Sequence, residues 1–324
     1  MPDQGGSIIS KATAIYGRLL RIHTAIISSN ERHQPWLSTL IIFLTTLAQV
    51  AHAQITPVKL VDSSRVDPFS PNQDKRAIMV TSYVPVNFGN TKFNSYLAPH
   101  TEALSDKGYP AIIFSPGISA SRLFYSSILK AVASSGIAVV SVDHPYDALS
   151  VEFPDGKAIY SANLSAADPL PLNTRVQDVI FALDQLNQNL MLIPSSFTGT
   201  LNVNKVAIVG HSFGGATAAS AMLNETRFAG GLNFDGALWG PRQLQLSDSM
   251  HCTFTDFPLL RNASVWPVKV KQASSALMGP LSGLPVRAIL ADYVVAAARY
   301  FVTGEKSKLL DGPPGDYPEV RYVA

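Results

Sequence analysis

The chain has 324 residues, of which 47% are hydrophobic and 15% charged, and its formal net charge is +2. This balance is typical of a globular protein with a sizeable core and excludes a disordered or fibrous chain. The 25 basic residues are scattered along the sequence, so we expect no nucleic-acid partner and favour a small molecule. The one cysteine, Cys252, excludes an intrachain disulfide and a metal site made of several cysteines.

Residues 1–53 read as a leader. An uncharged apolar segment begins at Trp36 and ends in Ala51-His52-Ala53, the small-x-small pattern that signal peptidase accepts. We predict cleavage after Ala53 and a secreted, extracellular product. A membrane anchor and a buried helix are the alternatives, because an apolar run of about 18 residues is at the lower limit for spanning a bilayer. Residues 54–324 then form one α/β domain.

Along this domain, strand and helix patterns alternate. Pro-rich segments at 57–71 and 312–318 predict extended arms near the two ends. Apolar residues at helical spacing predict helices over 122–136 and 174–190. Short apolar runs rich in β-branched residues predict buried strands over 77–86, 111–115, 137–142, 205–210 and 229–235. The alternation predicts a mostly parallel central sheet with helices on both faces.

A Gly-His-Ser-Phe-Gly stretch, residues 210–214, lies where a predicted buried strand meets an Ala-rich helix. In that position the pattern is typical of a nucleophile elbow, a strained turn that lifts the serine hydroxyl above the sheet. A Cβ at Gly210 or Gly214 would collide with the adjoining strand and helix. We therefore predict Ser212 as a nucleophile; the alternative is an ordinary Gly-rich turn.

Chain order selects the partners of this serine, because in this arrangement the acid follows the nucleophile and the histidine comes last. His251 is the one histidine after Ser212, so it is the predicted base unless it is a surface loop residue. Glu225, Asp235 and Asp248 lie between the two. We favour Asp235, because it closes a predicted strand and so projects at the carboxyl edge of the sheet, where ligands bind.

The remaining predictions concern the neighbours of these residues. Backbone N–H groups of Phe213 and of Ile118, in the loop after strand 111–115, are the expected oxyanion hole, and Gly117 lets that loop turn tightly. An ordinary Pro-Gly turn is the alternative for the loop. Cys252 is expected to be dispensable, since neighbours in an extended stretch point to opposite sides, away from His251.

Seven segments in one order resemble a known family: "FSPGISASRLFYSSI", "SVDHPYDAL", "RVQDVIFALDQL", "GHSFGGATAASAML", "GLNFDGALWGP", "MHCTFTDFPLL" and "LLDGPPGDYPEVRY". Over most of residues 77–324 the chain resembles the platelet-activating-factor acetylhydrolases of α/β-hydrolase fold, especially their fungal secreted relatives. The resemblance implies Ser212 as nucleophile, Asp235 as acid and His251 as base. It also implies calcium-independent cleavage of short or oxidised sn-2 acyl groups from phospholipids.

We therefore expect a serine esterase like a 1-alkyl-2-acetylglycerophosphocholine esterase, working without cofactor or metal on a small lipid or ester at a lipid–water interface. Another secreted carboxylesterase or polyesterase of the same fold, or an inactive truncated relative, is the alternative.

One interval departs from the family pattern. Only 15 residues separate Asp235 from His251, where the family carries a further strand and a long crossover. A crossover with its helix needs at least about 10 to 12 residues before the strand that it feeds, so both cannot fit. We expect the sheet to lack one late strand, through a deletion, an alternative splice form or a faulty gene model.

Overall fold

The computed structural model describes residues 53–85, 108–188, 192–195, 197, 199–236, 243–263, 267–312, 315 and 317–323. The predicted leader, residues 1–53, falls outside the described residues except for Ala53. Cleavage after Ala53 and the anchor alternative therefore stay predictions.

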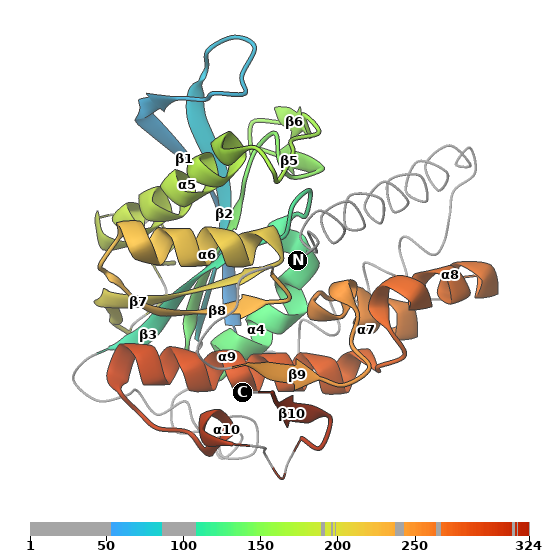
Figure 1. Cartoon of the computed structure of the whole chain (residues 1–324). Helices are drawn as coiled ribbons and strands as arrows, with labels where there is room; N and C mark the ends of the chain where they lie inside the picture. Colours follow the sequence, from blue (N-terminus) through green and yellow to red (C-terminus); the bar gives the residue numbers. More distant parts are fainter. Residues whose placement is uncertain are drawn as a thin grey trace, which may run out of the picture.

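The core is a six-stranded sheet in the order β1-β2-β4-β3-β7-β8 (Figure 1). Strands β4, β3, β7 and β8 are parallel to one another. Strand β2 runs antiparallel to both of its neighbours, β1 and β4. The strand bounds are β1 Ala53–Val66, β2 Lys75–Pro85, β3 Tyr109–Ser115, β4 Ala138–Asp143, β7 Leu201–His211 and β8 Phe228–Phe234. The mostly parallel sheet and all five predicted strands are confirmed.

Helices cover both faces of this sheet (Figure 1). Helices α5 (Pro169–Gln188) and α6 (Phe213–Asn224) pack on one face, and α4 (Ser126–Ser134) and α9 (Gly283–Thr303) on the other. Strand β3 is buried at every position, and its side chains alternate between the two apolar clusters. This double burial explains why the parallel strands read as continuous apolar runs.

Smaller elements complete the domain. The antiparallel pair β5 and β6 follows β4, and a second pair, β9 with β10, stands apart from the main sheet. Their bounds, with those of the remaining helices, are β5 Ser150–Glu152, β6 Ala158–Tyr160, β9 Leu244–Leu246, β10 Val320–Tyr322, η2 Arg122–Tyr125, η4 His251–Phe254, α7 Phe257–Ala263, α8 Val268–Met278 and α10 Lys308–Asp311.

The N-terminal Pro-rich arm is where the predicted elements and the structure differ. Much of 57–71 belongs to the edge strand β1, in which Pro57 lies opposite Thr81 of β2. Proline is tolerated there because an edge strand leaves part of its backbone unpaired. The C-terminal arm matches better, since Tyr317 packs over α9 through a ring contact with Tyr293.

In the described part of the chain the central sheet ends at β8, as expected for a fold without the late strand. Of the 15 residues after Asp235, the structure describes 236 and 243–250, and within these the one strand is the three-residue β9. Strand β8 is half-buried or exposed at every position after Phe228. The edge that a further strand would cover in a larger sheet is therefore β8 itself.

One helical stretch among the described residues, Val268–Thr303, is long and apolar enough to cross a membrane by length and composition. Helix α9, which ends this stretch, packs its buried side chains into the cluster on β3 and β7. A core helix passes the same test, so this stretch does not bear on the anchor alternative.

Candidate active site

Ser212 occupies the turn between β7 and α6. Its backbone is strained, with φ 56° and ψ −119°, a region that non-glycine residues rarely adopt. Its N–H donates to the carbonyl of Phe234 at 2.8 Å, which fixes the turn to the end of β8. A Cβ at Gly210 would collide with the Gly214 carbonyl, and one at Gly214 with the Ser115 carbonyl. The backbone therefore has the geometry of a nucleophile elbow.

His251 and Asp235 meet beside this turn. His251 begins η4, and Asp235 directly follows β8 with φ 50°. The Nδ1 atom of His251 lies 2.5 Å from Oδ2 of Asp235. An Nδ1–H donated to the carboxylate leaves Nε2 as the basic nitrogen of a neutral ring. The Asp235 side chain is 46% exposed, so solvent reaches this pair.

The other two acids lie elsewhere. Glu225 accepts a hydrogen bond from Arg227 at 2.7 Å, and this contact lowers the pKa of the carboxyl to about 2. Asp248 is exposed, in a turn where its φ is 58°. Of the three acids between Ser212 and His251, Asp235 is thus the one that contacts the histidine.

His211 connects the elbow to the predicted base. It immediately precedes Ser212, and its ring centroid lies 4.6 Å from that of His251. Its Nε2 atom is 3.0 Å from the backbone oxygen of His251. The predicted nucleophile, acid and base are thereby brought together at the carboxyl ends of β7 and β8.

Three described residues in this neighbourhood are of types that could together hold a metal ion. Ligand atoms of His211, Asp235 and His251 lie within 4.8 Å of one another. Both ring nitrogens of His211 are engaged, however, one with the Tyr125 hydroxyl and one with the His251 carbonyl. The cluster fits a hydrogen-bonded catalytic site better than a metal centre, because a ligating nitrogen must offer its lone pair to the ion.

The predicted oxyanion groups lie on two adjacent segments. Ile118 is half-buried in the loop after β3, and Phe213 is the first residue of α6. The first turn of α6 touches the start of the loop so closely that a Cβ on Gly214 would meet the carbonyls of Ser115 and Pro116. N–H groups at a helix N-terminus have no partner within the helix, which suits them to an oxyanion.

An ion pair between Arg175 and Asp147 fixes the backbone of the loop after β3. Arg175 of α5 donates to the carbonyls of Pro116 and Gly117 at 2.8 and 3.0 Å. It is paired with Asp147 at 2.6 Å, and Asp147 accepts the N–H of Ser119 at 3.0 Å. The guanidinium also lies 4.8 Å from the centre of the Phe213 ring. Arg175 and Asp147 together hold both sides of Ile118.

Sequence reasoning missed the buried charges of α5, Arg175 and Asp178, although a signal was present. Arg175 and Asp178 fall three apart on the stripe that also carries Val179 and Ala182, the buried face of α5. Charged residues within an apolar stripe are rarely buried unless paired, so they indicate buried ion pairs.

A second Ser-His-Asp chain lies below the loop. The Oγ atom of Ser115 is 3.0 Å from Nε2 of His144, whose Nδ1 is 2.9 Å from Asp178. All three are at most 1% exposed, and Asp178 also pairs with Arg76 at 2.6 Å. Burial and the nearby Arg175 charge lower the pKa of His144 to about 4. These three buried side chains are out of reach of a substrate, so we assign them the role of supporting the end of β3.

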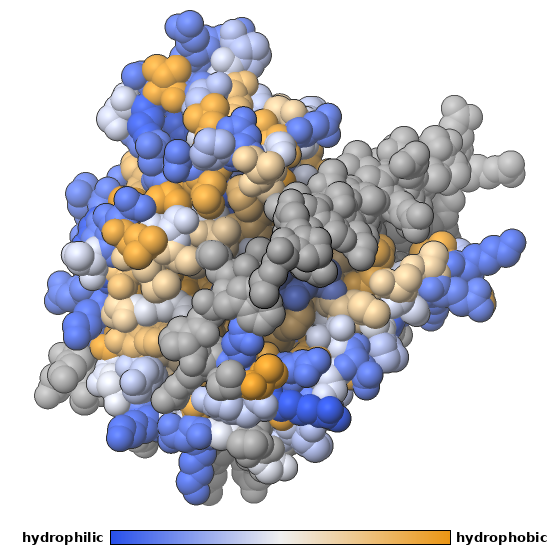
Figure 2. All heavy atoms as spheres, in the orientation of Figure 1, coloured by the Kyte–Doolittle hydropathy of each residue, from blue (hydrophilic) through white to orange (hydrophobic). Residues whose placement is uncertain are grey.

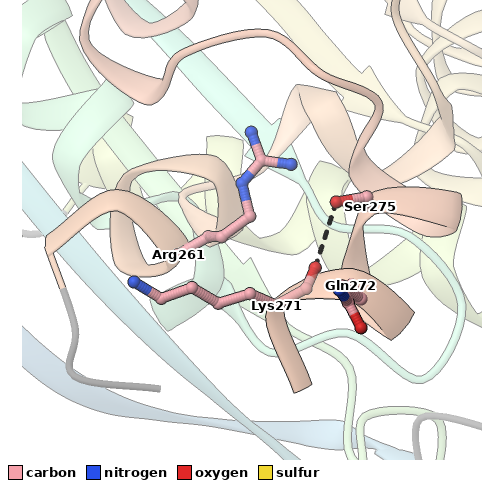
Figure 3. A pocket seen from close by; sticks show the side chains of 4 residues that line it. All are labelled: Arg261, Lys271, Gln272 and Ser275. Atoms are coloured by element: carbon pink, nitrogen blue, oxygen red, sulfur yellow. Dashed lines mark hydrogen bonds between the residues drawn. The ribbon is translucent and has the colours of Figure 1, made fainter. Parts of the chain in front are cut away.

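A surface hollow of about 420 Å³ lies between α7 and α8 and is lined by Arg261, Lys271, Gln272 and Ser275 (Figure 3). Helix α8 projects from the body of the protein, and its outer end is hydrophilic (Figures 1 and 2). Arg261 already donates to the carbonyls of Gly279 and Leu281. The hollow contains none of the predicted catalytic residues.

Comparison with known proteins identifies relatives of this chain. The family model described as platelet-activating factor acetylhydrolase, isoform II matches residues 72–153 and 174–255. A protein of Arthroderma benhamiae named "Probable 1-alkyl-2-acetylglycerophosphocholine esterase" is 29% identical over 268 residues, 67% of this chain and 66% of that protein. The platelet-activating factor acetylhydrolase of Cavia porcellus is 32% identical over 151 residues, 39% of this chain and 35% of that protein.

These matches span two thirds or less of the relatives' own lengths. Among solved structures, a ferulic acid esterase from Streptomyces cinnamoneus superposes with a TM-score of 0.67 and 23% identity, over 85% of this chain and 97% of that one. That likeness establishes the fold alone, which is the predicted α/β-hydrolase fold.

Proposed function

Because the chain belongs to the platelet-activating factor acetylhydrolase, isoform II family, we propose that it is a serine esterase acting on the sn-2 acetyl or oxidised short acyl ester of phospholipids. The observation that carries the proposal is the contact between His251 and Asp235 beside the elbow serine, Ser212. The fungal relative's name supports the substrate class. We also propose that the protein is secreted and meets its substrate at a lipid–water interface.

In the proposed reaction, Nε2 of His251 takes the hydroxyl proton of Ser212 while Oγ attacks the ester carbonyl. Asp235 holds the imidazole in the tautomer with Nδ1–H and stabilises the imidazolium that forms. The N–H groups of Phe213 and Ile118 bind the oxyanion. His251 then protonates the departing lysophospholipid alkoxide, and a water that it deprotonates releases the acid from the acyl-serine.

The first test is the nucleophile. Ser212→Ala is expected to abolish hydrolysis and labelling by a fluorophosphonate while leaving the thermal transition in place, because Ser212 is the serine in the strained turn between β7 and α6, whereas Ser119, whose φ is also positive, lies in the loop after β3. Peptide mapping should find the label on Ser212 and not on the buried Ser115. Labelling that survives in Ser212→Ala would assign the nucleophile to another serine.

The substrate class needs a separate panel. A 1-alkyl-2-acetyl phospholipid, its 2-palmitoyl analogue, a p-nitrophenyl ester and a polyester film distinguish the candidates. We expect the acetyl phospholipid to be the best substrate. Turnover of simple esters or polyester alone would favour a carboxylesterase or polyesterase of the same fold. A wild-type chain that neither turns over nor labels is an inactive relative.

The proposed routing is tested on the secreted product. Cleavage after Ala53 predicts that N-terminal sequencing of protein from the medium begins at Gln54. A membrane-bound product that retains Met1 or Pro2 would instead support the anchor.

A further inference from the structure

Tyr125, the last residue of η2, is 1% exposed and carries its hydroxyl between two catalytic segments. The hydroxyl oxygen accepts the N–H of Gly117 at 3.2 Å and lies 2.8 Å from Nδ1 of His211. On the far side of that ring, Nε2 of His211 is 3.0 Å from the carbonyl oxygen of His251. These contacts form one continuous line of hydrogen bonds.

The direction of each hydrogen bond in this line follows from chemistry. The His251 carbonyl can only accept, so Nε2 of His211 carries the hydrogen. Nδ1 of the neutral ring is then an acceptor, and the Tyr125 O–H donates to it. Burial lowers the pKa of His211 well below its ordinary value and raises that of Tyr125, so both groups stay neutral. Every donor in the line has a matching acceptor.

The line joins the three segments that the proposed reaction depends on. Gly117 adjoins Ile118, the expected oxyanion donor, and His211 adjoins Ser212. The third segment begins with His251 itself. We propose that Tyr125 and His211 are positioning residues, which fix the oxyanion loop and the His251 backbone relative to the nucleophile. This inference rests on the proposed esterase function, from which it takes the roles of Ser212, His251 and Ile118. It assigns no substrate contact to the side chains of Tyr125 and His211.

A buried tyrosine hydroxyl could equally serve stability alone, and the chain offers a matched control for that role. Tyr83 is also 1% exposed, belongs to the same apolar cluster and places its hydroxyl 3.2 Å from Oγ of Ser126. Tyr83→Phe and Tyr125→Phe each remove one buried hydroxyl and keep the ring. Only the second change interrupts the line between catalytic segments.

The experiment compares these variants in the full chain, using p-nitrophenyl acetate hydrolysis, fluorophosphonate labelling rate and thermal unfolding. We expect Tyr125→Phe to lower kcat and the labelling rate about 10- to 100-fold with KM within about twofold, because small misplacements of reacting groups have effects of this size. Tyr83→Phe should lower the thermal midpoint to a similar degree and leave kcat at the wild-type value.

A second variant tests the His251 side of the line. His211→Gln can still donate near the former Nε2 position, so its kcat should lie well above that of His211→Leu. Wild-type kcat in Tyr125→Phe, or equal kcat in His211→Gln and His211→Leu, would overturn the inference. Neither result would touch the proposed function, whose failure appears separately as a wild-type chain that does not label or a Ser212→Ala chain that does.

Discussion

At the scale of single residues, Cys252 tests whether the site contains one nucleophile or two. It neighbours His251 but is 1% exposed, and burial raises the pKa of its thiol to about 12. The sequence predicts that Cys252 is dispensable because it lies in an extended stretch, but that reason is wrong, since residues 251–254 form the 3-10 helix η4. Burial now supplies the reason, since the thiolate is the reactive form.

We therefore predict that Cys252→Ser and Cys252→Ala keep wild-type kcat on p-nitrophenyl acetate. The serine variant should lose more stability, because it buries a hydroxyl, at a cost of about 1 to 3 kcal/mol without a partner. Hydrolysis assays and urea unfolding measure the two effects. A large fall in kcat at unchanged stability would assign the thiol a catalytic part.

His144 predicts how stability depends on pH. Its pKa is about 4 in the folded chain, against the usual 6.5, so between these values the unfolded chain binds a proton that the folded one does not. Stability should fall as the pH drops through this window, by at most about 3 kcal/mol. Asp256, whose pKa burial raises to about 7, acts in the opposite direction between its unfolded pKa and pH 7.

The contribution of His144 is isolated by comparison with His144→Asn, in which Asp256 is unchanged. The variant should be less stable at pH 7.5 but lose less stability between pH 7.5 and pH 5, as measured by urea unfolding. An identical loss in both proteins would show that His144 does not titrate as its burial implies.

At the scale of elements, the loop after β3 depends on α5. Arg175 reaches two carbonyls and the Asp147 carboxylate at once through its planar guanidinium, which a lysine cannot reproduce. We predict that Arg175→Lys lowers kcat at least about tenfold, because the Ile118 N–H loses its fixed place and a lost oxyanion donor costs about 10² to 10³. The control is Arg227→Lys on the surface, where kcat should not change.

Circular dichroism and thermal unfolding should accompany these assays, since breaking a buried ion pair costs about 3 to 5 kcal/mol. Arg175→Lys with wild-type kcat would mean that the loop keeps its shape without the clamp.

The elements also show what sequence could predict. Strands β3, β4 and β7 were predictable because parallel strands covered on both faces form apolar runs in the sequence. Strand β2 is antiparallel but is also buried at nearly every position, and β8 was predictable from the apolar residues of its own short run. Strand β1 was not, because an edge strand with proline and exposed residues resembles an arm. Chain order and the strand end led to Asp235 and His251, and these do contact each other. Tyr125 and His211 were missed, because their contacts join residues 86 and 40 positions apart.

At the scale of the whole molecule, β8 is the last strand of the central sheet among the described residues, and we expect this edge to limit the stability of the site. Leu232 and Phe234 are only partly buried, whereas Ile112 and Phe114 of β3 are at most 1% exposed. Full burial of a large apolar side chain contributes about 1.5 to 3 kcal/mol, so Leu232 and Phe234 each forgo a part of that amount, against a net stability of about 5 to 15 kcal/mol for a whole domain. Asp235 directly follows this edge, and its side chain is 46% exposed.

We therefore predict that the chain as given is poorly soluble and weakly active, because an unpaired edge strand also invites association with other chains. Inserting a relative's strand and crossover after Pro241 should raise the thermal midpoint, give a monomer by light scattering and increase ester hydrolysis. A Gly/Ser segment of equal length is the control and should do none of these, since it supplies no strand to pair with β8. A monomeric, cooperatively unfolding chain whose specific activity equals that of the strand-bearing variant would contradict the prediction, and would mean that β8 functions as a native edge.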